Sequence, residues 1–539
     1  MKRYLVIFAL FAATTLLAQE KAIKPLDVPM SFSGTYGELR RNHFHGGVDW
    51  RVGGKIGDPI HVIKSGYICQ VSVSVYGYGN GIYVKHNDGT MSVYGHMSAY
   101  TPKIAALVKK AQYEKKRYNV NLYFGPDDFP VKQGDIIGRV GSTGSSAGPH
   151  LHMEVRDSSN VPMNYISMGY YKPVDNMRPH IARVAFYSYD DCSPVANTFR
   201  VRNIPDPKNF SGEVNLPKES YVAIDAYDIQ DGTTGKLAVE EYRVTLDDRM
   251  IFRFKVGNVG FDEGSDIKSL IEYRESYAGG RDMVKSVVDP GNSLSYKTDT
   301  LDGGLIILED YERHTVRIEA LDEHGNKAVV ALPVRRDDTI QLPLADTSFN
   351  NTPVLWFTPN MVCGDGFKYL LAPGALYNSF NLRWKKTADA DVQNGRLSPS
   401  WKIGDAWIPL KISGMLIIDA EDIPAPLLSK AYIASLPGMG YAGPLSGARV
   451  GFGTYCIGVD TEGPRITVDK NNVIRVFDAF SGTESVDVEI DGKWHLSQNR
   501  GGRVTILDKG SISKGVHNLK ITAIDVLGNE TVWNKNVTF

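Results

Sequence analysis

The chain has 539 residues, a formal net charge of −1 at pH 7 and 22% charged residues. Such a balance gives no global basic field, so the composition argues against nucleic acid as a partner and against charge-driven membrane binding. This length predicts roughly three to five domains. Aromatic residues at 10%, with 53 glycines and 27 prolines, favour many short strands, and we expect a mainly β protein.

Residues 1–19 have the pattern of a secretory signal peptide. Lys2 and Arg3 precede an apolar run, which ends in small residues before a polar one. The apolar run of about 15 residues is marginal for a membrane-spanning helix, so an uncleaved anchor is the alternative. Cys69 is the first cysteine, which argues against a lipoprotein. We therefore expect an exported protein of the periplasm or cell envelope, without an integral span after signal removal.

The first candidate metal ligands lie in Asn42-His43-Phe44-His45-Gly46-Gly47-Val48-Asp49. His45 and Asp49 are four residues apart, and the glycines between them let the backbone bend tightly. Neutral imidazole and carboxylate are both zinc ligands, and a catalytic zinc site keeps three protein ligands and an open position. This spacing alone is a weak signal.

A hairpin is predicted next, with strands at Ile82–His86 and Met91–His96 around Asn87-Asp88-Gly89. It places His96 at the far end of the returning strand. An insert follows at about 101–130. Thr101 and Pro102 suit the N-cap and first position of a helix that continues to about Tyr118. Its basic residues predict a solvated cationic face or, alternatively, a wall of a substrate groove; they are Lys109, Lys110, Lys115, Lys116 and Arg117.

The stretch from His150 to Arg156 alternates strictly between polar and apolar residues. Such a period of two predicts a strand with one packed face, which leaves His150 and His152 side by side on the other face. Two imidazoles in this arrangement can approach one ion. Glu154 follows on the same face and could orient a ligand histidine, although a solvated glutamate is the simpler interpretation.

Four blocks together resemble peptidase family M23, the lysostaphin-type LytM domain, over about residues 30–165. The blocks are His45–Asp49, Gly77–Gly89, Tyr94–Ser98 and Gly141–His152, in the family's order. The resemblance implies a small antiparallel β domain that binds one Zn²⁺ per chain through His45, Asp49 and His152. It also implies that His96 and His150 are the catalytic pair, with their division of roles left open. Arg40 could line the substrate groove or be solvated.

The function implied by the resemblance is a zinc metalloendopeptidase acting on peptidoglycan peptide, at stem peptides or crosslinks. One alternative is a non-catalytic M23-like regulator of another cell-wall hydrolase. Such relatives typically lack zinc ligands, whereas this chain keeps all five positions. The other alternative is an exported peptidase with a non-wall protein substrate.

Beyond the predicted peptidase domain, residues 20–172, we expect three β-sandwich-type domains at 173–340, 341–462 and 463–539. Thr315–Asn326 and Asn518–Asn529 repeat one hairpin pattern, in which Asp precedes a Gly-Asn turn. This repeat suggests immunoglobulin-like units at 173–340 and 463–539. We expect the three domains to scaffold the enzyme or to dock an envelope protein.

The remaining cysteines and histidines carry weaker predictions. Cys69 is expected to be a buried thiol, whereas Cys363 and Cys456 could form a disulfide. The histidines of the later domains lack partners at ligand spacing, so we expect them to be solvated or packed; they are His180, His314, His324, His495 and His517.

Overall fold

The computed structural model describes residues 20–40, 42–190, 198–294, 299–341, 346–421 and 423–539. The predicted signal peptide lies outside them. Strands dominate this part of the chain, which confirms the mainly β fold. Its α-helices are α1 (Pro102–Glu114), α2 (Ile267–Leu270) and α3 (Tyr273–Tyr277). Within these ranges, no helix has the length and apolar character needed to cross a membrane.

The N-terminal unit is built on an antiparallel sheet in the order β1-β4-β13-β8-β7-β6-β10, with β11 also paired to β6. A smaller sheet, β5-β12-β9, and the β2-β3 hairpin complete the unit. The strands are β1 (Phe32–Gly34), β2 (Leu39–Arg40), β3 (His43–Phe44), β4 (Val48–Arg51), β5 (Pro59–His61), β6 (Gly66–Val73), β7 (Asn80–His86), β8 (Met91–Tyr94), β9 (Ala99–Tyr100), β10 (Val120–Tyr123), β11 (Pro130–Val131), β12 (Ile136–Arg139) and β13 (His150–Arg156).

The predicted helix is present as α1, with Thr101 at its N-cap and Pro102 in its first turn. It ends at Glu114, earlier than expected, and the chain then returns as β10 along the free side of β6. Ile104 and Val108 bury the apolar face of α1 against the N-terminal unit. The insert is therefore an integral layer of this unit.

The second unit packs a sheet ordered β15-β14-β17-β20, to which β22 adds through β17, with a sheet ordered β16-β24-β23-β18-β19-β21. Its strands are β14 (His180–Ser188), β15 (Arg200–Ile204), β16 (Val214–Leu216), β17 (Glu219–Tyr227), β18 (Glu241–Leu246), β19 (Arg249–Lys255), β20 (Val284–Lys285), β21 (Asp299–Thr300), β22 (Ile306–Ile307), β23 (Arg313–Leu321) and β24 (Lys327–Arg336).

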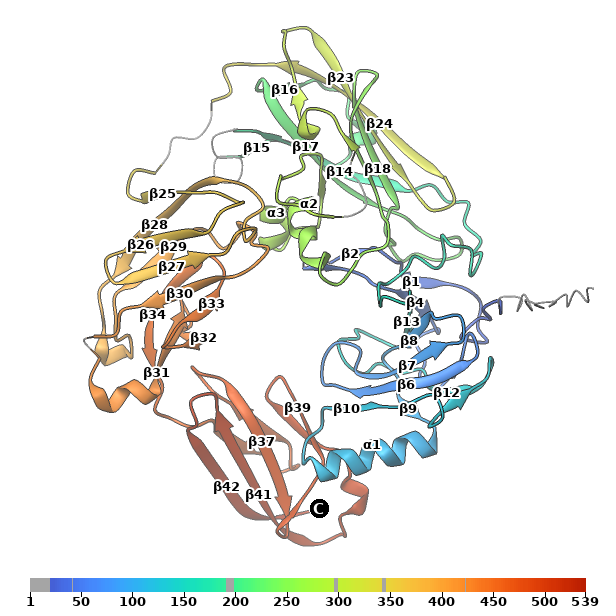
Figure 1. Cartoon of the computed structure of the whole chain (residues 1–539), viewed down its shortest axis with the longest axis vertical. Helices are drawn as coiled ribbons and strands as arrows, with labels where there is room; N and C mark the ends of the chain where they lie inside the picture. The colour runs from blue at the N-terminus through green and yellow to red at the C-terminus, as the bar shows by residue number, and fades with distance from the viewer. Residues whose placement is uncertain (1–19, 41, 191–197, 295–298, 342–345, 422) are drawn as a thin grey trace, which may run out of the picture.

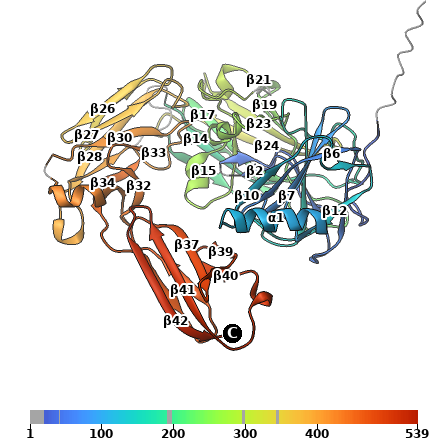
Figure 2. The same ribbon diagram turned by 60° about the horizontal axis from the view of Figure 1, so that its bottom comes forward.

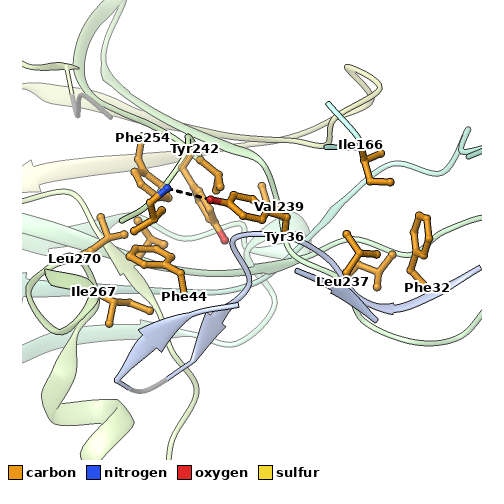
Figure 3. Packing of buried hydrophobic residues seen from close by; sticks show 14 of the residues in the cluster. Phe32, Tyr36, Phe44, Ile166, Leu237, Val239, Tyr242, Phe254, Ile267 and Leu270 are labelled. Atoms are coloured by element: carbon orange, nitrogen blue, oxygen red, sulfur yellow. Dashed lines mark hydrogen bonds between the residues drawn. The ribbon is translucent and has the colours of Figure 1, made fainter. Parts of the chain in front are cut away.

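One hydrophobic core runs through the N-terminal and second units. Phe44 and Tyr36 from the first unit belong to the same buried cluster as Phe254 and Ile267 from the second. Figure 3 shows these side chains meeting around the β2-β3 hairpin. The Tyr36 hydroxyl donates to the carbonyl of Pro162 at 2.9 Å and accepts from the Val259 N–H at 3.0 Å. The two units are thereby held together as one packed body.

The middle unit has sheets β25-β28-β29-β34-β31-β32 and β26-β27-β30-β33. Its strands are β25 (Asn350–Val354), β26 (Asn360–Gly364), β27 (Phe367–Leu371), β28 (Phe380–Ala388), β29 (Ser400–Ile403), β30 (Gly414–Ile418), β31 (Ala431–Ser435), β32 (Gly440–Pro444), β33 (Ala448–Val450) and β34 (Gly453–Val459).

The C-terminal unit has two four-stranded sheets, β35-β36-β40-β39 and β38-β37-β41-β42. Its strands are β35 (Arg465–Val468), β36 (Ile474–Phe477), β37 (Thr483–Ile490), β38 (Lys493–Trp494), β39 (Ser497–Arg500), β40 (Arg503–Ile506), β41 (Val516–Asp525) and β42 (Glu530–Thr538).

The four units follow one another around a ring (Figure 1). The ring closes where α1 meets the C-terminal unit. There the Tyr113 hydroxyl donates to the Asp508 carboxylate, and the Tyr113 and Trp494 rings pack edge to face with centroids 5.3 Å apart. Figure 2 shows β39 and β40 close to the end of α1 in a second view. The cationic helix thus serves as a docking element within the chain.

Cys363 and Cys456, which could have formed a disulfide, are both free thiols in the structure. Cys456 is buried in strand β34, whereas Cys363 is exposed on β26 of the other sheet. Cys69 is also a free thiol and is half-buried. Cys192 lies outside the described residues.

Removing the Tyr36 hydroxyl tests the shared core. Tyr36 is 5% exposed, so Tyr36→Phe leaves the Val259 N–H and the Pro162 carbonyl without this partner in a dry environment. We expect a loss of about 1–3 kcal/mol in the free energy of unfolding, measured in urea. Tyr123→Phe is the control, because that side chain is 72% exposed. Equal stability of the two variants would contradict the account.

Candidate metal centre and active-site cavity

Strand pairing brings His152 and Asp49 together. In the antiparallel pair β4-β13 these residues lie directly opposite each other. His152 Nδ1 is 2.9 Å from Asp49 Oδ1, and His45 Nε2 is 3.1 Å from the same oxygen and 3.0 Å from His152 Nδ1. All three side chains are buried. The structure therefore brings together the three side chains that were predicted to bind the metal.

The glycines between His45 and Asp49 allow a close approach to β13. A β-carbon on Gly47 would lie 2.5 Å from the carbonyl oxygen of Met153 and 2.9 Å from Cε1 of His152. Any side chain there would push His45 and Asp49 away from His152. Glycine is therefore required at position 47 because any larger residue would collide with the neighbouring strand.

Hydrogen bonds fix which nitrogen of each ligand histidine faces the centre. His45 Nδ1 lies 2.8 Å from the Thr35 carbonyl oxygen, which only accepts, so Nδ1 carries the proton and Nε2 presents a lone pair. His152 Nε2 lies 2.9 Å from Glu154 Oε1, which leaves Nδ1 for the centre. Each ligand is oriented by an acceptor behind it, as in known metal sites.

His96 and His150 flank this centre, with ring centroids 4.7 Å apart. His96 Nδ1 lies 2.8 Å from the carbonyl of Thr143, and His150 Nδ1 lies 2.8 Å from that of Gly148. His150 Nε2 is 3.5 Å from Asp49 Oδ1. His96 lies two residues beyond the end of β8, where the strand was predicted to continue, and has φ 60°, an uncommon value outside glycine. The pair therefore lies beside the three candidate ligands, with His150 Nε2 turned toward the carboxylate of Asp49.

Glu154 is not the solvated residue that the simpler interpretation favoured, because it is 1% exposed. Its carboxylate accepts from His152, from the Tyr78 hydroxyl and from Arg156. Hydrogen bonds from His152 and the Arg156 charge outweigh the effect of burial and lower the pKa of Glu154 to about 2. It is an ionised acceptor that orients His152. The sequence signal for this role was its place two residues after His152 on the same face.

The charges of the centre are strongly coupled. Burial acts to raise the pKa of Asp49, but hydrogen bonds from His150, His152 and His45 hold that pKa far below its usual range. Burial acts to lower the pKa of His152, yet Asp49 and Glu154 raise it to about 9. Burial and the neighbouring imidazoles lower the pKa of His96 to about 4. At neutral pH, His96 is therefore an uncharged imidazole that can accept or donate a hydrogen bond.

A cavity of about 890 Å³ opens over these residues. Arg40 lines the cavity and is also 43% exposed, so both predictions for that residue remain compatible with the structure. None of the basic residues predicted on the helical insert lines the cavity. Sequence reasoning missed Tyr78, whose ring centroid lies 5.3 Å from that of His152. It also missed the contribution of the second unit, which supplies the Val259–Phe261 segment to the cavity wall. Phe261 lies under the guanidinium of Arg156, 4.8 Å from ring centroid to Cζ.

The donor set fits zinc. Zinc takes histidine nitrogen and carboxylate oxygen at about 2.0–2.2 Å, so neighbouring ligands of a tetrahedral site lie roughly 3.3 Å apart. The three candidate ligand atoms lie 2.9–3.1 Å from one another, close to that separation. His45, Asp49 and His152 would hold the ion, and the cavity lies on their open side.

The family comparison agrees with this geometry. The model of peptidase family M23 matches residues 43–113 and 126–165, which include all five predicted site residues. This part of the chain is a peptidase family M23 domain. The gap in the match, 114–125, covers the end of α1 and strand β10 of the insert. A second model, a Zu5-like domain, matches residues 351–460 in the middle unit.

Curated relatives of the M23 domain include two named peptidases. The DD-carboxypeptidase/endopeptidase Mpg of Neisseria meningitidis is 30% identical over 129 residues, which are 24% of this chain and 24% of the relative. Lysostaphin of Staphylococcus simulans is 36% identical over 143 residues, 25% of this chain and 24% of the relative. The chain thus spans about a quarter of the length of these relatives.

Solved structures similar to the M23 domain include two catalytic domains. That of the prophage-encoded M23 protein EnpA from Enterococcus faecalis is 28% identical and has a TM-score of 0.19; the match covers 26% of this chain and 91% of the other. The catalytic domain of lysostaphin from Staphylococcus simulans is 30% identical and has a TM-score of 0.19. The match covers 26% of this chain and 88% of the other.

Metal binding by this centre should release a proton. Because His152 has a pKa of about 9 without metal, it must lose a proton before Nδ1 can bind an ion. We expect zinc affinity to rise with pH up to about 9. An ordinary imidazole is already neutral above about pH 7.5. A rise in zinc affinity between pH 7.5 and pH 9 would therefore be due to deprotonation of His152. Calorimetry in buffers of different ionisation enthalpy measures the release, and a pH-independent affinity in that range would contradict the assignment.

Neutralising Glu154 should weaken metal binding without removing a ligand. Glu154→Gln loses the ionised acceptor behind His152, and such partners typically contribute 10–100-fold in metal affinity. We expect a loss of that size in zinc competition with a chelator. Glu114→Gln is the control, because the Glu114 side chain is 62% exposed at the end of α1. Unchanged affinity in Glu154→Gln would show that the hydrogen bond plays no part in the site.

Proposed function

We propose that this chain is an exported zinc-dependent endopeptidase that cleaves peptidoglycan peptide, at stem peptides or crosslinks. The observation that carries the proposal is the convergence of His45, Asp49 and His152 beside His96 and His150. The names of the Mpg and lysostaphin relatives support the peptidase activity. The pattern of residues 1–19 supports export.

The residues of the centre suit hydrolysis of an amide bond. Bound zinc would supply Lewis acidity and lower the pKa of a water molecule towards 7. His150, with Nδ1 held by Gly148 and Nε2 turned toward Asp49, is placed to accept the proton of the attacking water. His96, neutral at pH 7, is placed to donate a hydrogen bond to the oxyanion or to pass a proton to the leaving amine.

The cavity suits a peptide with free carboxylates. Arg40 and Arg51 both line it, and glycine backbone at Gly53 and Gly54 leaves room beside them. The Phe261 ring from the second unit adds an apolar wall. A peptide bound here would contact two units of the chain at once.

A substitution series tests the two kinds of residue separately. We expect His45→Ala and Asp49→Ala to lose both zinc and activity, because each removes a ligand. We expect His150→Ala and His96→Ala to retain stoichiometric zinc and lose about 10²–10⁴-fold in turnover, the usual contribution of proton transfer. Zinc content is measured by elemental analysis, and turnover by mass spectrometry of defined muropeptides.

Two controls make the result decisive. A chelator should abolish the release of new amine termini from sacculi, and zinc should restore it. A purified wild-type chain that holds no stoichiometric zinc and leaves sacculi intact would favour a non-catalytic regulator. A chain that holds zinc and cleaves proteins but not sacculi would favour a non-wall substrate.

A further inference from the structure

The hairpin repeated in the second and C-terminal units builds the same side-chain arrangement twice. After β23, Asp322 accepts from the N–H of Asn326 at 2.8 Å and from its side-chain amide at 2.8 Å. After β41, Asp525 accepts from Asn529 in the same two ways, each at 2.7 Å. Each turn thereby presents a fixed, buried carboxylate at the end of its unit.

A second aspartate joins each turn from the segment that enters the unit. Asp175 precedes Pro179 by four residues, as Asp460 precedes Pro464. The side-chain amide of Asn326 lies 3.3 Å from the carbonyl oxygen of Asp175, and that of Asn529 lies 3.1 Å from the carbonyl oxygen of Asp460. Carboxylate oxygens of Asp175 and Asp322 lie within 4.8 Å of each other and of a ring nitrogen of His324; in the C-terminal unit, Asp460, Asp478 and Asp525 meet the same limit.

In the second unit, a further carboxylate is buried at this place; the backbone of Ile229 hydrogen-bonds to it, but one of its oxygens is left over. Asp228, directly after β17, is 4% exposed, and its Oδ1 has no hydrogen-bond partner. Its carboxylate lies within hydrogen-bonding reach of that of Asp175, an arrangement that two ionised groups resist. Burial, together with the charge of Asp175, raises the pKa of Asp228 to about 7. A buried carboxylate with an unused oxygen requires a cation or a proton.

A small cavity lies at this junction. Its volume is about 30 Å³, enough for one ion or water, and Asp175, Asp228, Asp322 and His324 line it. Glu240 and Glu323 add further acids, and no lysine or arginine is among the residues that line it. The only lining side chain that can carry a positive charge is His324, which sequence reasoning took as solvated or packed.

We propose that Asp175, Asp228 and Asp322 form a Ca²⁺ site at the junction between the peptidase and second units. Calcium takes carboxylate and carbonyl oxygens at 2.3–2.6 Å in a flexible geometry, which suits three aspartates from separate segments. The bound ion would neutralise their mutual repulsion. This proposal is independent of the proposed peptidase activity.

The calcium site would connect the linker that contains Asp175 with the peptidase unit and the second unit. Asp228 lies two residues before Gln230, which accepts from the Phe32 N–H at 3.1 Å and donates to the Met30 carbonyl at 3.2 Å in the peptidase unit. Asp175 belongs to the linker, and Asp322 to the β23-β24 turn. Calcium would therefore stiffen the joint that holds the second unit against the active-site cavity.

Calcium titration of the zinc-loaded full chain, after removal of calcium with a selective chelator, tests the site. Calorimetry should show wild type binding at least one Ca²⁺ more than Asp228→Asn. In the chelator, Asp228→Asn should melt at or above the wild-type temperature, because the substitution relieves repulsion. Added Ca²⁺ should raise the wild-type melting temperature more than that of Asp228→Asn, and more than Mg²⁺ does.

Asp248→Asn is the matched control, because Asp248 is exposed in the β18-β19 turn of the same unit. It should bind calcium as wild type does. Asp175→Asn, in the linker, should repeat the loss seen in Asp228→Asn. Equal calcium stoichiometry and affinity in wild type and Asp228→Asn would overturn the proposal, as would an equal effect of Mg²⁺ on wild type.

Discussion

The pairing register of β4 and β13 is the constraint on which the candidate metal centre depends. It places His152 opposite Asp49 and, on the other face, buries Leu151 and Met153 completely. A slip of one residue would exchange the two faces, so that the imidazoles entered the core and the apolar residues faced the cavity. The same hydrophobic burial that stabilises the sheet therefore fixes the positions of the ligand atoms. Glu154 and Thr35 then set the orientation of the two ligand rings from behind.

The packing of the N-terminal unit extends beyond the residues that the family model matches. The β2-β3 hairpin, which leads into the first ligand, packs its Phe44 side chain into the core that the second unit completes. That unit also places Val259, Gly260 and Phe261 on the cavity wall. A movement at this joint would change the shape of the cavity without touching any ligand. The Zu5-like and C-terminal units then complete the ring and return to α1, whose residues reach the Asp508 carboxylate.

Much of the site could be predicted because short stretches of sequence determine the local backbone geometry around it. The alternation of His150–Arg156, the His45–Asp49 spacing and the hairpin before His96 each specify a backbone geometry that the structure shares. The mainly β fold and the start of α1 followed from composition and from Thr101-Pro102. The end of α1 could not be predicted in this way, because it depends on the pairing of β10 with β6, which draws the chain after Glu114 out of the helix.

Other features depend on contacts between segments distant in sequence. The burial of Glu154 results from Tyr78 and Arg156 closing over it, and a single strand pattern cannot reveal that. The approach of Phe261 to Arg156 joins residues more than a hundred positions apart. Likewise, the sequence showed no partner for His324 at ligand spacing, because Asp175 comes from a linker about 150 residues earlier in the chain. The free state of Cys363 and Cys456 reflects their positions on different sheets.

X-ray absorption at the zinc K-edge of the purified full chain tests the central claim most directly. The account predicts zinc bound only by nitrogen and oxygen at about 2.0–2.2 Å, with the multiple-scattering signature of two imidazoles, and loss of that signature in His45→Ala. A shell of sulfur at about 2.3 Å, or a spectrum unchanged in His45→Ala, would contradict it.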